Sequence, residues 1–229
     1  MSAEAGPTLH YFAIKGRGEP IRMTFAACGA QFKEADMDFG KMKAKAGSAI
    51  SPCGQAPLLE VDGAYLCQMT AIMRFIGAKY KPALIGDGLL QKAHVDMLLN
   101  SIDDLYLKYI QCVYGSGLED TPKAALWAKH FDPQSKAKSN DGAHMAYLVG
   151  FIERSPGPFL CGANFTIADI FFYFTLEAYV RTQCFGANLA ASYPALTTYM
   201  AAVCAVDGLQ ARLTDPKRAE LAFNGNGKG

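Results

Sequence analysis

The sequence predicts two domains, a small α/β domain with a mixed sheet and an all-helical domain after it. Up to about residue 80 the hydrophobic period changes between strand and helix, in the order βαβ and then ββα. The segment 81–90, KPALIGDGLL, contains the proline and glycines of a linker. After it, helical spacing dominates. We therefore expect domains over residues 1–81 and 91–215, with a linker at 82–90.

The elements of the first domain follow from short apolar segments between turn residues. Strands are predicted at 8–13, 31–38, 57–62 and 64–67, and helices at 21–28 and 68–80. Pro20 stands at the first position of its helix, where a missing N–H is tolerated, and Gly29 stands at the C-cap. Asp62-Gly63 is a strong hairpin signal. Together these elements predict a mixed four-stranded sheet with helices on it.

The second domain is read as a series of helices separated by glycine and proline. They are predicted at about 91–115, 121–131, 137–155, 167–184 and 194–205. Thr166 and Asp169 form a capping arrangement, in which Asp169 reaches back to the residue that opens the fourth helix. Residues 216–229, which end in NGNGKG, are predicted to be a flexible tail.

Composition and charge exclude several classes of function. The chain has 229 residues, is 51% apolar, and carries 22 basic and 21 acidic side chains for a net charge of +1. Such a balance predicts neither a nucleic-acid partner nor an anionic membrane surface. The uncharged stretch at 182–206 is interrupted by Gly186 and Pro194, so it is read as a loop and a buried helix rather than a membrane span. The N-terminus has no signal-peptide pattern.

Cysteine and histidine usage predicts a reducing compartment and no metal site. The seven cysteines form no CxxC pair, and several lie in apolar runs, as Cys28 and Cys204 do. The four histidines are scattered, and no cluster has metal-ligand spacing. The Gly16-Arg17-Gly18 turn is too short for a dinucleotide fingerprint, and there is no Walker loop.

Two corners flank the predicted hairpin in the stretch GQAPLLEVDGAYLCQM, residues 54–69. Pro57 precedes a strand, and a cis Ala56-Pro57 bond would turn neighbouring main-chain groups outward. Gln68 opens a helix, whose first-turn N–H groups favour an anion. With Tyr11 and the basic turn at Arg17, these corners can converge at one edge of the sheet. The pattern predicts a site for a small, extended, anionic peptide.

These segments, in order, resemble a cytosolic glutathione transferase. The matching stretches are LHYFAIKGRGEPIRMTFAACG, GQAPLLEVDG, QMTAIMRFI, HVDMLLNSIDDLY and NFTIADIFF, and they extend over roughly residues 8–206. The stretch from Tyr11 through GRGEPIR and the HVD…DD helix are most similar to the sigma-like class. The resemblance implies a thioredoxin-like first domain, a helical second domain, glutathione as co-substrate without a metal, and a cytoplasmic homodimer that acts in detoxification.

The resemblance also assigns catalytic roles. It implies that Tyr11 donates a hydrogen bond to the glutathione sulfur, which would favour the thiolate because a hydrogen bond to the charged form lowers its pKa. Without the resemblance, Tyr11 reads as a half-buried strand aromatic. Arg17 matches a position that would add positive potential beside the thiolate, and its alternative role is a surface charge.

Further matches imply how glutathione is held. Ala56, before a cis Pro57, would pair with the cysteinyl part through its backbone, and Gln55 and Gln68 would hold the two ends. Lys43 matches the lysine at the glycyl carboxylate. Asp103 matches an acid that reaches the γ-glutamyl amine across a dimer interface. Beside Asp104, it can equally be a solvated helix residue.

The chain departs from the family pattern at two of the glutathione-binding positions. Met69 replaces a serine, and Phe39 replaces a tryptophan before an insertion that puts the placement of Lys43 in question. A methionine side chain donates no hydrogen bond.

The resemblance implies a second-substrate pocket with Phe12, Tyr106 and Ile110 as candidates, although an aromatic at 106 also fits core packing. The expected reaction is conjugation of glutathione to small apolar electrophiles. A sigma-type prostaglandin isomerase and a weakly active, crystallin-like structural relative remain alternatives. A thiol–disulfide exchanger is disfavoured because residues 11–15 contain no cysteine.

Overall fold

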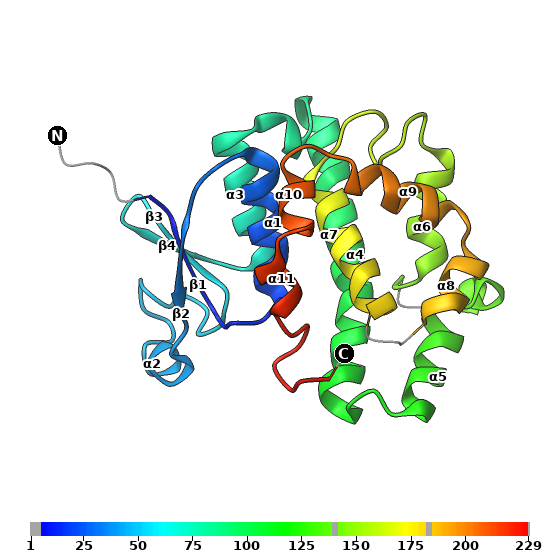
Figure 1. The fold of residues 1–229 in the computed structure, drawn as a ribbon, viewed down its shortest axis with the longest axis horizontal. Coiled ribbons are helices and arrows are strands. Elements are labelled where there is room, and N and C mark those ends of the chain that lie inside the picture. The colour runs from blue at the N-terminus through cyan, green and yellow to red at the C-terminus, as the bar shows by residue number, and fades with distance from the viewer. Residues whose placement is uncertain (1–5, 139–141, 182–184, 229) are drawn as a thin grey trace. The chain divides into compact units, whose positions relative to one another are not determined.

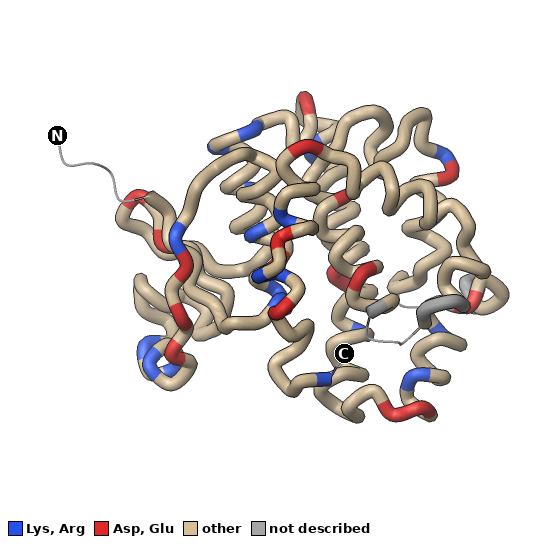
Figure 2. Tube along the Cα trace, viewed as in Figure 1, with Lys and Arg blue, Asp and Glu red and all other residues tan. Residues whose placement is uncertain are grey.

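The computed structural model describes residues 6–138, 142–181 and 185–228, and its chain forms two compact units (Figure 1). The first contains the chain up to Lys81 together with Asp207–Ala222. The second contains Pro82–Val206 and the residues from Phe223 onward. Basic and acidic residues are interspersed along both units (Figure 2). Within the described ranges, no helix combines the length and the apolar character needed to cross a bilayer.

The first unit contains a mixed four-stranded sheet, which confirms the predicted fold class. The strands are β1 (Thr8–Tyr11), β2 (Lys33–Asp36), β3 (Leu58–Val61) and β4 (Ala64–Cys67), in the order β2-β1-β3-β4. β1 is parallel to β2 and antiparallel to β3, and β3 pairs with β4 as a hairpin. Asp62 and Gly63 both have positive φ, at 50° and 76°, as the predicted tight turn requires.

Helices α1 (Glu19–Cys28) and α3 (Met69–Tyr80) pack against each other in the first unit. Gly29 ends α1 in the left-handed conformation, with φ 64°, as predicted. The buried residues of α3 recur with helical spacing and include Ile72, Met73 and Ile76. The remaining elements of this unit are η1 (Gly16–Gly18), α2 (Phe39–Ala44), α10 (Leu209–Leu213) and α11 (Pro216–Glu220).

The second unit is helical, as predicted. Its elements are η2 (Pro82–Ile85), α4 (Gly88–Ser116), α5 (Asp120–His130), η3 (Pro133–Lys138), α6 (Met145–Arg154), α7 (Ile167–Arg181), α8 (Gly186–Ser192) and α9 (Ala195–Cys204). Helices α4 and α7 pack together through aromatic side chains such as Tyr106 and Phe171. The backbone N–H of Thr166 donates to Asp169 Oδ2 at 2.8 Å, as the capping prediction requires. The Thr166 hydroxyl also donates to that carboxylate, at 2.9 Å.

Several element boundaries differ from the predictions. Helix α4 begins at Gly88, so it takes in the end of the predicted linker. The predicted helix 137–155 is divided into η3 and α6, with residues 139–141 outside the described ranges. The described part of the predicted helix 167–184 ends at Arg181, and residues 182–184 are not described. The sequence patterns did not reveal α2, α8, α10 or α11, because such short helices offer few turns of periodicity.

The C-terminal segment also differs from the predicted flexible tail at 216–229, of which residue 229 lies outside the description. Asp215 caps α11 by accepting the Lys217 N–H, and Pro216 occupies the first turn. Arg218, Phe223 and Asn224 are buried. The glycines at the end of the chain obscured this N-cap signal in the sequence.

Candidate functional site

Predicted site residues of the first unit gather at one end of its sheet. Tyr11 ends β1 opposite Asp36, which ends β2. The β1–β3 register pairs His10 with Leu58, so Pro57 comes just before β3 at the same end. Leu58 also pairs with Cys67, which places Gln68 directly after β4 at that end. The sheet therefore brings the Tyr11 corner, the Ala56-Pro57 corner and the start of α3 to one edge.

The Tyr11 side chain is held by the turn that follows it. Its hydroxyl oxygen accepts the backbone N–H of Arg17 at 2.8 Å. Gly16 and Gly18 lie against the ring, and a Cβ added at Gly18 would come within 2.9 Å of three ring carbons. The ring is buried, whereas Arg17 is half-buried. The turn thus fixes the phenol in place and orients a backbone dipole toward its oxygen.

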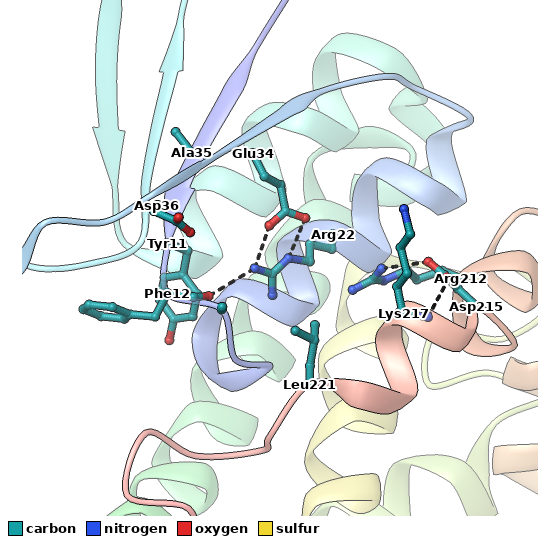
Figure 3. A pocket seen from close by; sticks show the side chains of 11 residues that line it. Tyr11, Phe12, Arg22, Glu34, Ala35, Asp36, Arg212, Asp215, Lys217 and Leu221 are labelled. Carbon is teal, nitrogen blue, oxygen red and sulfur yellow. Dashed lines mark hydrogen bonds and ion pairs between the residues drawn. The ribbon is translucent and has the colours of Figure 1, made fainter.

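Arg22 supports the backbone between Tyr11 and this turn (Figure 3). Its Nη1 donates to the Ile14 carbonyl at 2.8 Å and its Nη2 to the Phe12 carbonyl at 3.4 Å. Its guanidinium pairs with Glu34 at 2.8 and 2.9 Å, and its carbon lies 5.8 Å from the centroid of the Tyr11 ring. No motif in the sequence predicted this role for Arg22. The signal for it is an arginine within the apolar run of α1.

A buried carboxylate joins the start of α1 to the C-terminal segment of the same unit. Glu19 is fully buried and accepts from Arg212 at 2.7 and 3.1 Å and from Arg218 at 2.6 Å. Arg22 lies 3.6 Å from the same carboxylate. The Lys15 N–H donates to the Ala222 carbonyl at 2.8 Å. We call Glu19, Arg212 and Arg218 the arginine clamp.

A row of aromatic rings extends from Tyr11 to Lys43. The Tyr11 and Phe12 ring centroids are 5.4 Å apart, and Phe12 is 6.1 Å from Phe39. The Lys43 ammonium lies 5.3 Å from the Phe39 ring centroid. Phe39 and Lys43 are both exposed. Helix α2 thus presents an aromatic ring and a cation beside Phe12, although the insertion follows directly.

The hairpin corner has the backbone features expected of it. The Ala56-Pro57 bond is cis, and in the described part of the chain no backbone hydrogen bond involves Ala56. Gln55 and Gln68 are exposed, and Gln68 has φ 71° where it opens α3. The Met69 side chain is only 2% exposed. It therefore contributes to the core, and its backbone N–H is the group left at the first turn of α3.

Tyr11 and Phe12 also line a cavity of about 410 Å³ in the first unit (Figure 3). Its charged lining is balanced, with Arg22, Arg212 and Lys217 against Glu34, Asp36 and Asp215. Neither the Gln55–Pro57 corner nor Gln68 lines it. This cavity is therefore distinct from the hairpin corner.

The other predicted residues lie on α4 in the second unit. Tyr106 is 1% exposed, with its ring centroid 5.7 Å from that of Phe171 and 5.9 Å from that of Phe174. These contacts agree with the core-packing interpretation. Asp103 and Ile110 are half-buried. A role for Tyr106 and Ile110 with Phe12 in a second-substrate pocket stays a prediction. Among the described residues, no group of three or more His, Cys, Asp or Glu could hold a metal ion.

Comparison with known proteins places both parts of the chain in one family. Residues 7–78 match the N-terminal domain of glutathione S-transferases, and residues 104–214 match their C-terminal domain. The rat glutathione S-transferase alpha-2 is 31% identical over 211 residues, covering 89% of this chain and 86% of the relative. The bovine glutathione S-transferase P is 28% identical over 224 residues, covering 96% and 98%.

A solved structure shares the fold at lower identity. The Onchocerca volvulus Pi-class glutathione S-transferase superposes with a TM-score of 0.78 at 22% identity, covering 98% of this chain and all of the other. That likeness supports the fold, whereas the 31% identity to the rat protein over most of both chains shows membership of the same family. The chain therefore belongs to the glutathione S-transferase family.

Proposed function

We propose that this glutathione transferase conjugates glutathione to small apolar electrophiles, with Tyr11 stabilising the glutathione thiolate. The observation that carries the proposal is the fixed Tyr11 hydroxyl, which accepts the Arg17 N–H at the sheet end where both corners meet. Because the phenol oxygen is the acceptor in this contact, the contact uses no proton of the phenol.

The chemistry requires a thiolate at neutral pH. A free thiol has a pKa of about 8.5, so only a small fraction is ionised at pH 7. A hydrogen bond from Tyr11 to the sulfur would favour the charged form, and the N–H of Arg17 would polarise the phenol further. The thiol proton leaves to solvent, the sulfur lone pair attacks the electrophile, and the carbon–sulfur bond forms as the leaving group departs. Holding both reactants close would supply the rest of the acceleration.

The remaining residues would hold the tripeptide. Ala56 would pair with the cysteinyl backbone, while Gln55 and Gln68 would bind the ends of the peptide. Lys43 would meet the glycyl carboxylate, and the first turn of α3 would receive the γ-glutamyl carboxylate. The outward side chains of Gln55 and Gln68 and the position of Lys43 beside Phe39 support this arrangement.

The sigma-like class and its consequences belong to the same proposal. They rest on the GRGEPIR start and the HVD…DD helix, whereas the relatives described above are named alpha and P. We propose a homodimer in which Asp103 reaches the partner's γ-glutamyl amine, and a cytoplasmic role in detoxification. A glutathione-dependent isomerase and a weakly active structural relative are the alternatives.

The test combines retention on immobilised glutathione with turnover of a chlorodinitrobenzene-type substrate. We expect retention of the wild type, and turnover that falls about 10²-fold in Tyr11→Phe because one transition-state donor is lost. The pKa that governs kcat/KM should rise toward about 8.5 in this variant. Tyr147→Phe, which removes a hydroxyl from an exposed tyrosine of α6, is the matched control and should match the wild type.

Three outcomes would count against the proposal. Unchanged turnover in Tyr11→Phe would remove the tyrosine from the mechanism. Retention on glutathione without conjugation, but with turnover of an endoperoxide, would favour the isomerase. Neither retention nor turnover by the wild type would favour the structural relative.

A further inference from the structure

Two thiols meet beside the hairpin corner. Cys53 Sγ lies 2.7 Å from Cys67 Sγ, and the residues are 14 positions apart in the sequence. Cys53 comes directly before the Gly54–Pro57 corner, and Cys67 ends β4 directly before Gln68. Both cysteines are reduced in the structure. The pair therefore connects the two corners to which we assign glutathione binding.

The position of the pair sets it apart from other cysteines of the chain. Cys53 is exposed and Cys67 is half-buried, so an external reagent can reach the pair. Burial raises the pKa of both Cys28 and Cys161 to about 11, so a smaller fraction of these thiols is ionised at neutral pH than of a free thiol. A covalent S–S bond is about 2.05 Å long, so the two sulfur atoms need to approach by only about 0.7 Å.

We propose that Cys53 and Cys67 are a redox modification site, which glutathione disulfide converts to an intramolecular disulfide that weakens glutathione binding. Formation of the disulfide rests on the geometry of the two thiols alone. Its effect on glutathione binding rests on the proposed function. Cys53 directly precedes the Gly54–Pro57 corner and Cys67 directly precedes Gln68, so a covalent bond between them constrains both corners, whose binding groups must hold their places to within about 0.5 Å.

The reaction proceeds by two thiol–disulfide exchanges. The thiolate of exposed Cys53 attacks one sulfur of glutathione disulfide, which forms a mixed disulfide and releases one glutathione thiolate. Cys67 then loses its proton to solvent and attacks the Cys53 sulfur, which releases the second glutathione. Two protein thiols are oxidised by two electrons, and glutathione disulfide is reduced to two molecules of glutathione.

The environment of Cys67 agrees with this order of attack. Burial raises the pKa of the Cys67 thiol, and the neighbouring Cys53 thiol raises it further through its hydrogen bond and charge. The influence of the Cys53 charge disappears once Cys53 is in the mixed disulfide. Cys67 is therefore the resolving thiol.

The test treats the full chain with glutathione disulfide and follows intact mass, thiol number and the linked peptides. We expect the wild type to lose two thiols, retain no glutathione, and yield a peptide joined between Cys53 and Cys67. Cys67→Ser should stop at one bound glutathione on Cys53, and Cys53→Ser should form no internal disulfide. Cys28→Ala is the matched control and should behave as the wild type. A wild type that stays reduced, stops at the mixed disulfide or joins other cysteines would overturn the proposal.

The KM for glutathione tests the effect on binding separately from formation of the disulfide. We expect the KM for glutathione to rise about tenfold on oxidation and to recover on reduction, with no such change in Cys53→Ser. An oxidised protein with an unchanged KM would overturn the effect on binding. If the reduced protein neither binds nor turns over glutathione, the proposed function fails, whereas the peptide analysis still decides the disulfide.

Discussion

The orientation of Tyr11 depends on the absence of two side chains. Gly16 and Gly18 allow the 3₁₀ turn to lie against the ring, and Gly16 has φ 36°, which favours glycine. Gly18 has φ −79°, a value that any residue adopts, so its constraint is the space occupied by the ring. The sequence identified Tyr11 and the glycines, but their contact follows from how the chain turns after β1.

Gly18→Ala should therefore displace Tyr11 without straining the backbone. The added Cβ would come within 2.9 Å of ring carbons, so either the ring or the turn must shift. We expect kcat/KM for conjugation to fall about tenfold or more, since small misplacements of reacting groups are costly. Gly115→Ala in α4, where a Cβ would meet nothing within 4 Å, is the control and should leave kcat/KM unchanged. Full activity in Gly18→Ala would show that the ring position is unimportant.

Met69 illustrates what a local substitution means in three dimensions. In the sequence, Met69 stands in place of a serine and so lacks the serine hydroxyl. In the structure, its side chain belongs to the core. We expect Met69→Ser to lower the free energy of unfolding by about 2–5 kcal/mol, the range for truncating a buried methionine. Met97→Ser, at a residue that is 42% exposed, should change it by less than about 0.5 kcal/mol. Urea unfolding measures both, and equal effects would contradict the burial of Met69.

At the scale of elements, the arginine clamp ties α10 and α11 to the start of α1. Its partners are separated by 193 and 199 residues, and all of them lie in the first unit. Because α1 follows the Tyr11 turn directly, the clamp also steadies that turn. Arg22 acts at the same place through the Phe12 and Ile14 carbonyls.

Glu19→Gln should be strongly destabilising. The substitution leaves buried Arg218 and half-buried Arg212 without their shared carboxylate, and breaking a buried ion pair from one side costs about 3–5 kcal/mol. Asp62→Asn makes the same chemical change in the Lys79–Asp62 pair, where both side chains are more exposed, and should cost about 0–1 kcal/mol. Thermal or urea unfolding of the two variants gives the comparison. A small effect at Glu19 would mean that the clamp contributes little net stability.

For the whole molecule, the last residues of the chain are divided between the two units. Asp207–Ala222 complete the first unit, and the described residues from Phe223 onward belong to the second. There, Asn224 Nδ2 donates to the Tyr109 hydroxyl at 3.0 Å, and the Phe223 ring stacks on Phe174 at 5.7 Å. Each unit therefore depends on a part of the C-terminal segment.

Two truncations should separate these contributions. A chain that ends after Ala222 loses the buried Phe223 and Asn224, and we expect a loss of about 3–5 kcal/mol, as for a buried phenylalanine. A chain that ends after Asp215 also loses Arg218 from the clamp, which should cost a further 1.5–3 kcal/mol or so. The urea midpoint should fall in that order. An unchanged midpoint after either truncation would restore the interpretation of a loose tail.

The sequence by itself determined the features that depend on neighbours along the chain. Asp62-Gly63 specified its hairpin and Gly29 its helix end, because each signal is contained within a few residues. Tyr11, Ala56 and Gln68 could be named as candidates from local signals, whereas their position at one sheet edge follows from the pairing of the strands.

Only the tertiary structure decided which distant groups meet. The pairing of Glu19 with Arg212 and Arg218, the inward direction of Met69 and the contact of Cys53 with Cys67 all depend on the path of the chain between them. A charge or thiol has no periodic pattern that encodes its partner. Its partner is fixed by packing and by the need to neutralise buried charge, which operate across any sequence separation.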